Sequence, residues 1–201
     1  MSMNSVWVVS LLLATLALMP AAAHVLELPN KFTLSGIEYL TVQRLYRGWA
    51  FTRILALGAL LAMLVLLFMV RELPIAFALA WVAFLCVAGT QLVFWTFTQP
   101  VNRMTANWTF LPGDWSDLRR RWEYSHAASA LLNLIALVAL VVCLFWTNDV
   151  QTFDLDSARH SYAGAASRAA TDNRAPHSPS YEPAREHAGN GERPDSRAQY
   201  M

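Results

Sequence analysis

The chain has 201 residues, of which 56% are hydrophobic and 14% are charged, whereas a soluble domain usually carries about 25% charged residues. Its net charge of +1 leaves no electrostatic footprint for nucleic acid, so we expect no nucleic-acid partner. The two cysteines, Cys86 and Cys143, lie inside apolar segments and form no C-x-x-C pair. A membrane thiol oxidoreductase needs a paired and reachable dithiol, so this class is excluded.

Four segments contain almost no charge and have the length of a membrane-spanning helix, about 20 residues with a rise of about 1.5 Å each. They are residues 5–23, 50–70, 74–97 and 127–146. Lipid offers no partner to an unpaired backbone amide, which favours helices, and Leu- and Ala-rich runs without turn residues exclude a barrel. We predict an all-α integral membrane four-helix bundle in residues 1–147, with helices over residues 5–26, 38–70, 74–98 and 115–147.

The two ends of the chain allow different interpretations. The first apolar segment followed by Ala21-Ala22-Ala23 resembles a secretory signal peptide with its cleavage site, but residues 1–7 contain no Lys or Arg, which favours a retained helix. Residues 148–201 mix Arg, Ser, Ala, Pro, His, Asp and Glu without an apolar period. Such a segment cannot bury enough surface to offset its chain entropy, so we predict a disordered polar tail.

One tight turn and two long connections join the predicted helices. The turn is Arg71-Glu72-Leu73-Pro74, and the long connections are residues 27–46 and 98–124. By alternation, both long connections lie on one side of the membrane. They also carry most of the basic residues outside the tail, so the positive-inside rule places them in the cytoplasm. We expect the lipid partner to be the bilayer of a bacterial inner membrane.

A weak internal repeat relates the exits of the first and third predicted helices. The segment Glu27-Leu-Pro-Asn30-Lys31-Phe-Thr33 matches Gln99-Pro-Val-Asn102-Arg103-Met-Thr105 in the position of the Asn, the basic residue and the Thr. This match indicates two pseudo-repeated helical hairpins. Chance and a shared loop composition explain it equally well.

Polar residues gather in the half of the bundle that faces the long connections. Two sets of them have the spacing of one helix face. The sets are Tyr39, Gln43, Tyr46, Ala50 and Arg53, and Arg119, Glu123, His126, Ala130 and Asn133. Polar groups do not face lipid, so we predict that the two stripes line one cavity together with His24 and Glu27. The alternative is that these groups lie at the interface and that the alanines serve close helix packing.

Two short motifs raise the question of a metal. Glu123-x-x-His126 has the Glu-x-x-His spacing of di-iron bundles, and His24-x-x-Glu27 is its reverse. The predicted helices supply no two further glutamates for such a site, so we expect neither metal nor cofactor. A haem held between His24 and His126 is the second alternative. Acid–base work by His126 is the interpretation we favour.

The segment from Gln99 to His126 carries a recognisable pattern: Gln99-Pro-Val-Asn102, Asn107-Trp108, and Asp114-Trp115-x-x-Leu118-Arg119-x-x-Trp122-Glu123-x-x-His126. It resembles the anthrone-oxygenase-like family of small four-pass membrane proteins. His24-Val-Leu-Glu27-Leu-Pro29 is similar to its bacterial members, and the resemblance covers about residues 5–147. It implies the four-helix fold and carries over five positions. These are Asn102, Trp115, Arg119, Trp122 and His126.

Fungal members of that family oxidise anthrones to anthraquinones with molecular oxygen and without a bound cofactor, whereas most bacterial members have no assigned function. The resemblance therefore implies a small aromatic substrate, with His126 removing a methylene proton and Arg119 stabilising the oxyanion. We predict Glu123 as a third catalytic residue. The predicted substrate-binding residues are His24, Glu27, Arg53, Gln91, Asn102, Trp115, Trp122 and Asn133.

A different class of function fits the same residues. A non-catalytic membrane protein that binds a lipid, a small ligand or a partner helix would also need a polar half-cavity. The tryptophans near the long connections are typical of an interfacial aromatic belt, although they also offer stacking surfaces to a flat ligand.

Overall fold

The structure is a computed structural model that describes residues 2–172. Every regular element in this part of the chain is helical, as the sequence predicts. The elements are α1 (Met3–Thr33), α2 (Gly36–Gln43), the 3₁₀ turns η1 (Arg44–Tyr46) and η2 (Trp49–Phe51), α3 (Thr52–Val70), α4 (Pro74–Val93), the π-helical segment η3 (Phe94–Thr98), α5 (Gln99–Met104) and α6 (Trp115–Asp172).

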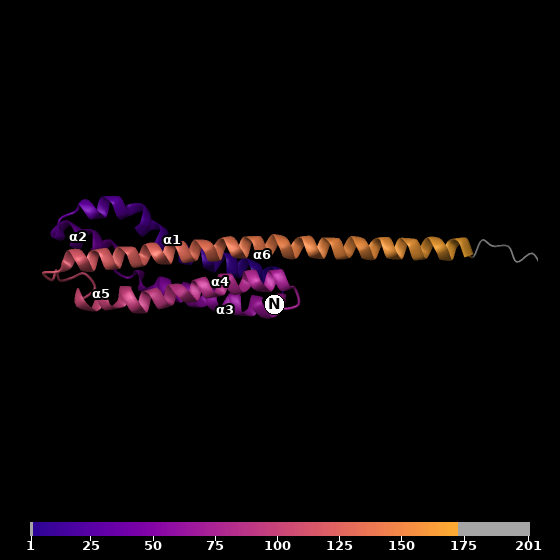
Figure 1. Cartoon of the computed structure of the whole chain (residues 1–201), viewed down its shortest axis with the longest axis horizontal. Helices are drawn as coiled ribbons and strands as arrows, with labels where there is room; N and C mark the ends of the chain where they lie inside the picture. The colour runs from indigo at the N-terminus through magenta and orange to yellow at the C-terminus, as the bar shows by residue number, and fades with distance from the viewer. Residues whose placement is uncertain (1, 173–201) are drawn as a thin grey trace, which may run out of the picture. The chain divides into compact units, whose positions relative to one another are not determined.

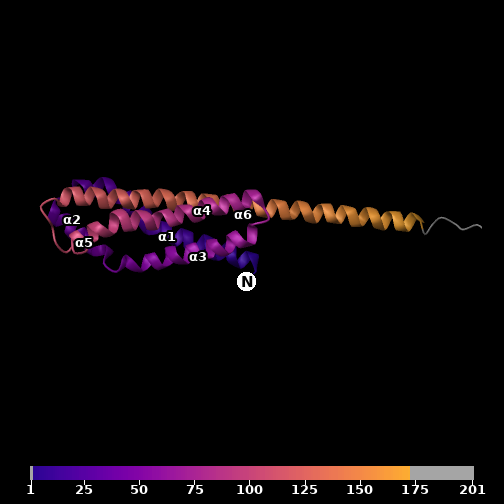
Figure 2. The same ribbon diagram turned by 60° about the horizontal axis from the view of Figure 1, so that its bottom comes forward.

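Four helical segments are long and apolar enough to cross a membrane, which confirms the predicted number. They are Met3–Thr33, Arg53–Val70, Pro74–Met104 and Trp115–Ala170. Helices α1, α3, α4 and the first part of α6 run alongside one another, with α2 and α5 at one end (Figures 1 and 2). The N-terminus lies at the other end, beside the turn between α3 and α4.

A backbone hydrogen bond and a proline make the turn between α3 and α4 tight. The backbone N–H of Leu73 donates to the carbonyl of Val70 at 2.9 Å. Pro74 follows in the first turn of α4, where its missing N–H leaves no helical bond unmade. The turn therefore reverses the chain within three residues and sets α3 antiparallel to α4.

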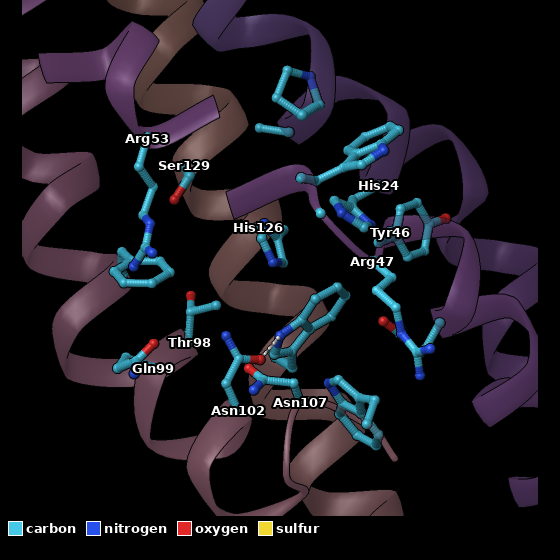
Figure 3. Close-up of a pocket in the computed structure, with 18 of the residues that line it drawn as sticks. His24, Tyr46, Arg47, Arg53, Thr98, Gln99, Asn102, Asn107, His126 and Ser129 are labelled. Carbon is cyan, nitrogen blue, oxygen red and sulfur yellow. Dashed lines mark hydrogen bonds between the residues drawn. The ribbon is translucent and has the colours of Figure 1, made fainter. Parts of the chain in front are cut away.

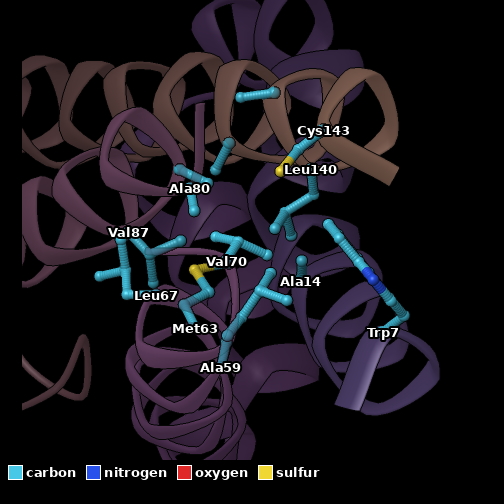
Figure 4. Close-up of a cluster of buried hydrophobic side chains, with 14 of the residues drawn as sticks. Trp7, Ala14, Ala59, Met63, Leu67, Val70, Ala80, Val87, Leu140 and Cys143 are labelled. Atoms are coloured by element: carbon cyan, nitrogen blue, oxygen red, sulfur yellow. The ribbon is translucent and has the colours of Figure 1, made fainter. Parts of the chain in front are cut away.

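Small side chains make up much of the surface where the helices meet (Figure 4). Buried alanines lie on all four long helices, among them Ala14, Ala59, Ala80 and Ala136. They pack around larger side chains such as Leu140, which is also fully buried. Small residues let helix backbones approach closely, which is the usual means of helix association in lipid. The large apolar side chains that point outward, such as Leu61, Phe68 and Leu85, would then contact acyl chains.

The predicted helix over residues 38–70 is interrupted. It consists of α2, η1 and η2 and then α3, because Arg47 is extended (ψ 123°) and Gly48 has φ 95°. A positive φ costs glycine little and other residues more, so Gly48 is where the chain can break. The stripe from Tyr39 to Arg53 thus does not lie on one continuous helix, which corrects that prediction.

Two other helical segments end beyond their predicted positions. Helix α1 continues to Thr33 rather than ending at residue 26, and the third span continues through η3 and α5 to Met104 rather than ending at residue 98. In both cases polar residues that suggest a connection form further helical turns. Pro29 and Pro100 do not prevent this, since Pro100 occupies the first turn of α5, where no N–H is needed.

Helix α6 also continues past its predicted end at residue 147, as far as Asp172. Residues 148–172 contain no proline and many alanines, a composition that favours helix even without an apolar face. The predicted disorder is therefore corrected for these residues, and residues 173–201 lie outside the described part of the chain. The chain divides into two units, Met1–Leu155 and Asp156–Met201, and the site described below belongs to the first.

The matched residues of the internal repeat have different surroundings. Lys31 is buried, whereas its counterpart Arg103 is exposed. Asn30 is exposed, whereas its counterpart Asn102 is half-buried. The repeat therefore does not mark equivalent functional positions, and a pseudo-symmetric origin of the two hairpins stays a prediction.

Candidate functional site

A cavity of about 580 Å³ opens in the half of the bundle that contains α2 and α5 (Figure 3). Its volume lies within the range of about 300–1,000 Å³ that small-molecule sites occupy. Every long helix contributes to its wall, together with the chain between α2 and α3 and the turn after α5. Residues that line it include His24, Tyr46, Trp49, Arg53, Gln91, Phe94, Asn102, Trp122, His126 and Asn133.

Two irregular backbone segments shape the cavity wall. The π-helical turn of η3 contributes Phe94 and Thr98 to it, and the Thr98 hydroxyl lies 2.7 Å from that of Ser125 on α6. After α5, the three residues Ala106, Asn107 and Trp108 all have φ between 49° and 57°. Left-handed non-glycine residues cost about 1–2 kcal/mol each, and such strain gathers at functional sites. These two segments are therefore a structural reason to look for function here.

Four rings form a compact cluster at the cavity. The imidazole centroids of His24 and His126 are 4.3 Å apart with an interplanar angle of 31°. The ring centroid of Tyr46 lies 4.4 Å from that of His24. The ring centroid of Trp122 lies 4.9 Å from that of His24 and 4.2 Å from that of His126. The two histidines predicted from separate helices thus meet, with aromatic faces on either side.

Lys31 is the centre of a polar network behind this ring cluster. The residue is only 2% exposed. Its Nζ lies 2.8 Å from Nδ1 of His24, 2.8 Å from Oε2 of Glu27 and 3.5 Å from Oε1 of Glu123. An ammonium group has three N–H donors and no acceptor. Nδ1 of His24 must therefore accept, and the proton of the neutral ring sits on Nε2.

Two tyrosines complete the network from the connection between α1 and α3. The Tyr39 hydroxyl donates to Oε1 of Glu123 at 2.8 Å, and the Tyr46 hydroxyl donates to Oε2 of Glu27. Burial, with the adjacent carboxylate as a further cause, raises the pKa of both hydroxyls above their ordinary value. Both groups therefore remain protonated donors at neutral pH.

Arg119 has a structural position that differs from the prediction. Its guanidinium donates to the carbonyls of Lys31 and Leu34 at 3.0 Å each, and it lies over the ring of Trp115. These carbonyls belong to the end of α1, where the helix leaves its last acceptors without intrahelical partners. Arg119 thus holds the end of α1 and does not line the cavity, so it is not placed to stabilise an oxyanion there.

The structure brings most of the predicted site residues together around the cavity and leaves four outside its wall. Trp122 and Asn102 are joined, since Nε1 of the indole donates to Oδ1 of the amide at 2.9 Å. The predicted residues that line the cavity are His24, Arg53, Gln91, Asn102, Trp122, His126 and Asn133. Those that do not are Glu27, Trp115, Arg119 and Glu123; of these, Glu27 and Glu123 belong to the network around Lys31.

Sequence reasoning missed Lys31, the one residue that joins both predicted carboxylates to His24. Its signal was present, since His24, Glu27 and Lys31 have the spacing i, i+3 and i+7 of one helix face. The prediction ended the first helix at residue 26 and so read Lys31 as a connection residue. Continuing that helix through Pro29 would have placed all three side chains together.

Metal and haem alternatives find no support in the geometry. Within residues 2–172, no group of three or more His, Cys, Asp and Glu side chains could hold a metal ion. Nδ1 of His24 is engaged by Lys31. With the two imidazoles in ring contact at 4.3 Å, no haem fits between them, because axial ligands bind from opposite faces of the macrocycle.

Several buried side-chain atoms of cavity-lining residues have no hydrogen-bond partner among residues 2–172. They are Nε2 of Gln43, Nε1 of Trp108, Nε2 of His126 and Oδ1 of Asn133. Each unmade bond costs about 1–3 kcal/mol, so packing alone does not account for several such shielded atoms in one wall. Comparison of the chain with known protein families, curated proteins and solved structures finds no match.

Proposed function

We propose that the protein binds a small, flat phenolic molecule of the anthrone type in this cavity and oxidises it with molecular oxygen, without a cofactor. The observation that carries the proposal is His126. Its ring lines the cavity between His24 and Trp122, and its nitrogens make no hydrogen bond within the described residues. An imidazole nitrogen without a partner can accept a proton from a bound molecule.

The aromatic wall supports the class of substrate. Phe94, Trp49, Tyr46 and Trp122 border the cavity from different elements. Aromatic pairs add about 0.5–1.5 kcal/mol beyond the area they bury, so a flat polycycle gains from these surfaces. Nε2 of His126 is shielded from solvent, and Nδ1 is the ring nitrogen that a bound molecule would reach.

The chemistry needs only a base and oxygen. His126 takes a proton from the methylene carbon of the anthrone, and the electron pair is delocalised onto the carbonyl oxygen as an enolate. This carbanion adds O₂ to give a hydroperoxide after it regains a proton. Loss of water then forms the second carbonyl, so one anthrone and one O₂ give one anthraquinone and one H₂O. Oxygen is the oxidant and no electrons leave the site.

Arg53 rather than Arg119 is placed at the cavity to stabilise the oxyanion. It lines the cavity from α3 and lies 4.7 Å over the ring of Phe94. In Figure 3 its side chain lies on the same side of the cavity as Ser129 and Thr98, beside His126. A guanidinium in a low-dielectric wall stabilises an enolate oxygen as its charge develops. We therefore assign oxyanion stabilisation to Arg53 in this reaction.

The test is oxygen uptake by the purified protein in nanodiscs of neutral lipid, with 1,8-dihydroxyanthrone as substrate and empty nanodiscs as background. We expect stoichiometric O₂ consumption with appearance of quinone absorbance, abolished in His126→Ala. His126→Gln, which keeps a hydrogen-bonding side chain, checks that folding is retained. Arg103→Ala, an exposed change at the same end of the bundle, should retain full activity.

The competing function is binding without chemistry. Anthrone that quenches the fluorescence of Trp49 and Trp122 without oxygen uptake above background would refute the oxygenase proposal and favour a ligand-binding protein. We also propose that the chain is a member of the anthrone-oxygenase-like family and resides in a bacterial inner membrane. The pattern around residues 99–126 and the basic residues of the long connections support these two assignments.

A further inference from the structure

The ionic residues that line the cavity are all basic. Arginines 44, 47 and 53 border it, and none of its wall residues is Asp or Glu. The two carboxylates of the network, Glu27 and Glu123, pair with Lys31 and are not part of the cavity wall. Basic side chains beside an apolar wall without acidic residues indicate a ligand that carries negative charge.

The arginines lie on two sides of the catalytic base. Arg44 belongs to η1 and Arg47 follows it, whereas Arg53 is on α3. Figure 3 shows Arg47 beside Tyr46 and Arg53 across from it, with His126 between them. Arg44 and Arg47 are exposed at the cavity rim, and no ion pair engages either side chain among residues 2–172.

We propose that the substrate carries a permanent anionic substituent, a carboxylate, which Arg47 and Arg44 bind at the rim while the aromatic body lies inside. This inference rests on the proposed function, in which Arg53 serves the enolate oxygen on the opposite side. The planar guanidinium fork matches a carboxylate in a bidentate manner. The rim is partly exposed, so this contact selects the substrate and steers its entry rather than driving the chemistry.

The basic residues also have a simpler explanation, because arginines at this end of the bundle satisfy the positive-inside rule. That explanation makes no distinction between arginines inside and outside the cavity. Arg103 offers the comparison, since it is exposed on α5, next to the cavity residue Asn102, and is not part of the wall. A cavity-specific role predicts different effects for Arg47 and Arg103.

The experiment compares two substrates that differ in one group, 1,8-dihydroxyanthrone and its 3-carboxylate, in phosphatidylcholine nanodiscs. We expect the carboxylate to have a KM lower by about tenfold, equivalent to about 1.4 kcal/mol, with similar kcat. In Arg47→Ala the KM ratio should fall to about one, and in Arg44→Ala it should fall in the same direction. Arg103→Ala should keep the wild-type ratio.

A binding measurement separates this inference from the proposed function. Tryptophan quenching by 1,8-dihydroxyanthraquinone and its 3-carboxylate reports affinity without turnover, and we expect the same preference and the same loss in Arg47→Ala. Equal affinities, or an equal loss in Arg103→Ala, would overturn the inference while leaving any anthrone oxidation intact. Absence of oxidation together with a preserved carboxylate preference would overturn the oxygenase reaction alone.

Discussion

Buried charge explains why the residues of the Lys31 network occur together. Glu123 is fully buried and Lys31 nearly so, and an isolated charge in such surroundings is costly. Lys31 and Arg119 supply two positive charges, and Glu27 and Glu123 supply two negative ones. Because each charge has an opposite charge or several carbonyl and hydroxyl partners, the network can exist inside an apolar bundle and hold His24 in one tautomer.

Lys31→Met should therefore destabilise the bundle. It leaves the carboxylate of Glu123 buried without a cation and removes the donor to His24, and loss of one partner of a buried pair costs about 3–5 kcal/mol. Thermal unfolding of the detergent-solubilised protein, followed by circular dichroism, measures the effect. Arg103→Met, which removes an exposed charge, should change the midpoint little.

The double variant Lys31→Met with Glu123→Gln shows whether the loss of stability comes from an unpaired buried charge or from the changed shape of the side chain. It removes both charges, so it should regain part of the stability that the single variant loses. A single variant as stable as the wild type, or a double variant less stable than the single one, would show that the network does not carry buried ionic charge.

Tyr46 makes stability depend on alkaline pH. Burial and the hydrogen bond to Glu27 raise its pKa in the folded state, whereas the unfolded hydroxyl ionises near about 10. The folded state thus holds the proton more tightly, so this stabilisation is complete below about pH 10 and is lost as pH rises further. Between about pH 9 and pH 11 the wild type should lose more stability than Tyr46→Phe in denaturant titrations. Parallel losses in the two proteins would contradict this origin.

The sequence predicted site residues correctly where their depth in the membrane determined their position. It failed where a long side chain could reach a different part of the structure. His24, His126 and Asn133 reach the cavity because a polar group within an apolar helix has no other favourable place. Arg119 shares a helix face with His126, but its long side chain extends to carbonyls at the end of α1. The sequence did not predict this contact, because the predicted first helix ended at residue 26 and α1 ends at Thr33.

At the scale of elements, helix breaks position the cavity wall. The chain between α2 and α3 contributes Tyr46, Arg47 and Trp49 because it leaves the helix at Gly48. The π-helical turn η3 and the left-handed turn after α5 place Thr98 and Trp108 in the wall. Periodicity predicts regular helices, so only the break at glycine had a local signal in the sequence.

Gly48→Ala tests this break against a matched control. A methyl group at Gly48 or at Gly113 meets nothing within 4 Å, but only Gly48 has a left-handed φ, 95°. The strain at Gly48 is therefore purely conformational and should cost about 1 kcal/mol, whereas Gly113→Ala should be close to neutral. Thermal unfolding of the two variants measures the difference. Equal effects would show that the chain does not need a positive φ at Gly48.

At the scale of the whole molecule, apolar length determined the fold. Four runs of membrane length with one tight turn leave few arrangements, so the number and order of the long helices were predictable. Their polar ends were not, because composition does not distinguish a polar helical turn from a loop. This is why Lys31, Arg103 and the residues after 147 were all assigned to connections or to the tail.

The same architecture predicts which segments face the same side of a membrane. Ser35 lies between α1 and α2 and Ser116 lies in the first turn of α6, whereas Glu72 lies in the turn between α3 and α4. All three side chains are exposed, so single cysteines at these positions should be reachable by a membrane-impermeant maleimide. Ser35→Cys and Ser116→Cys should label from one side of sealed vesicles and Glu72→Cys from the other. The positive-inside rule predicts that the first two positions are on the cytoplasmic side.

The parent protein sets the background of this experiment, since Cys86 and Cys143 lie within α4 and α6 and Cys143 is fully buried. Only one membrane-long helix, α3, lies between Ser35 and Glu72. If Ser35→Cys and Glu72→Cys label from the same side, the chain between them does not cross the membrane once. Four crossings would then be wrong, and with them the placement of the cavity at one membrane surface. Labelling as expected places the rim that contains Arg44 and Arg47 at the aqueous boundary, where an anionic substrate would enter.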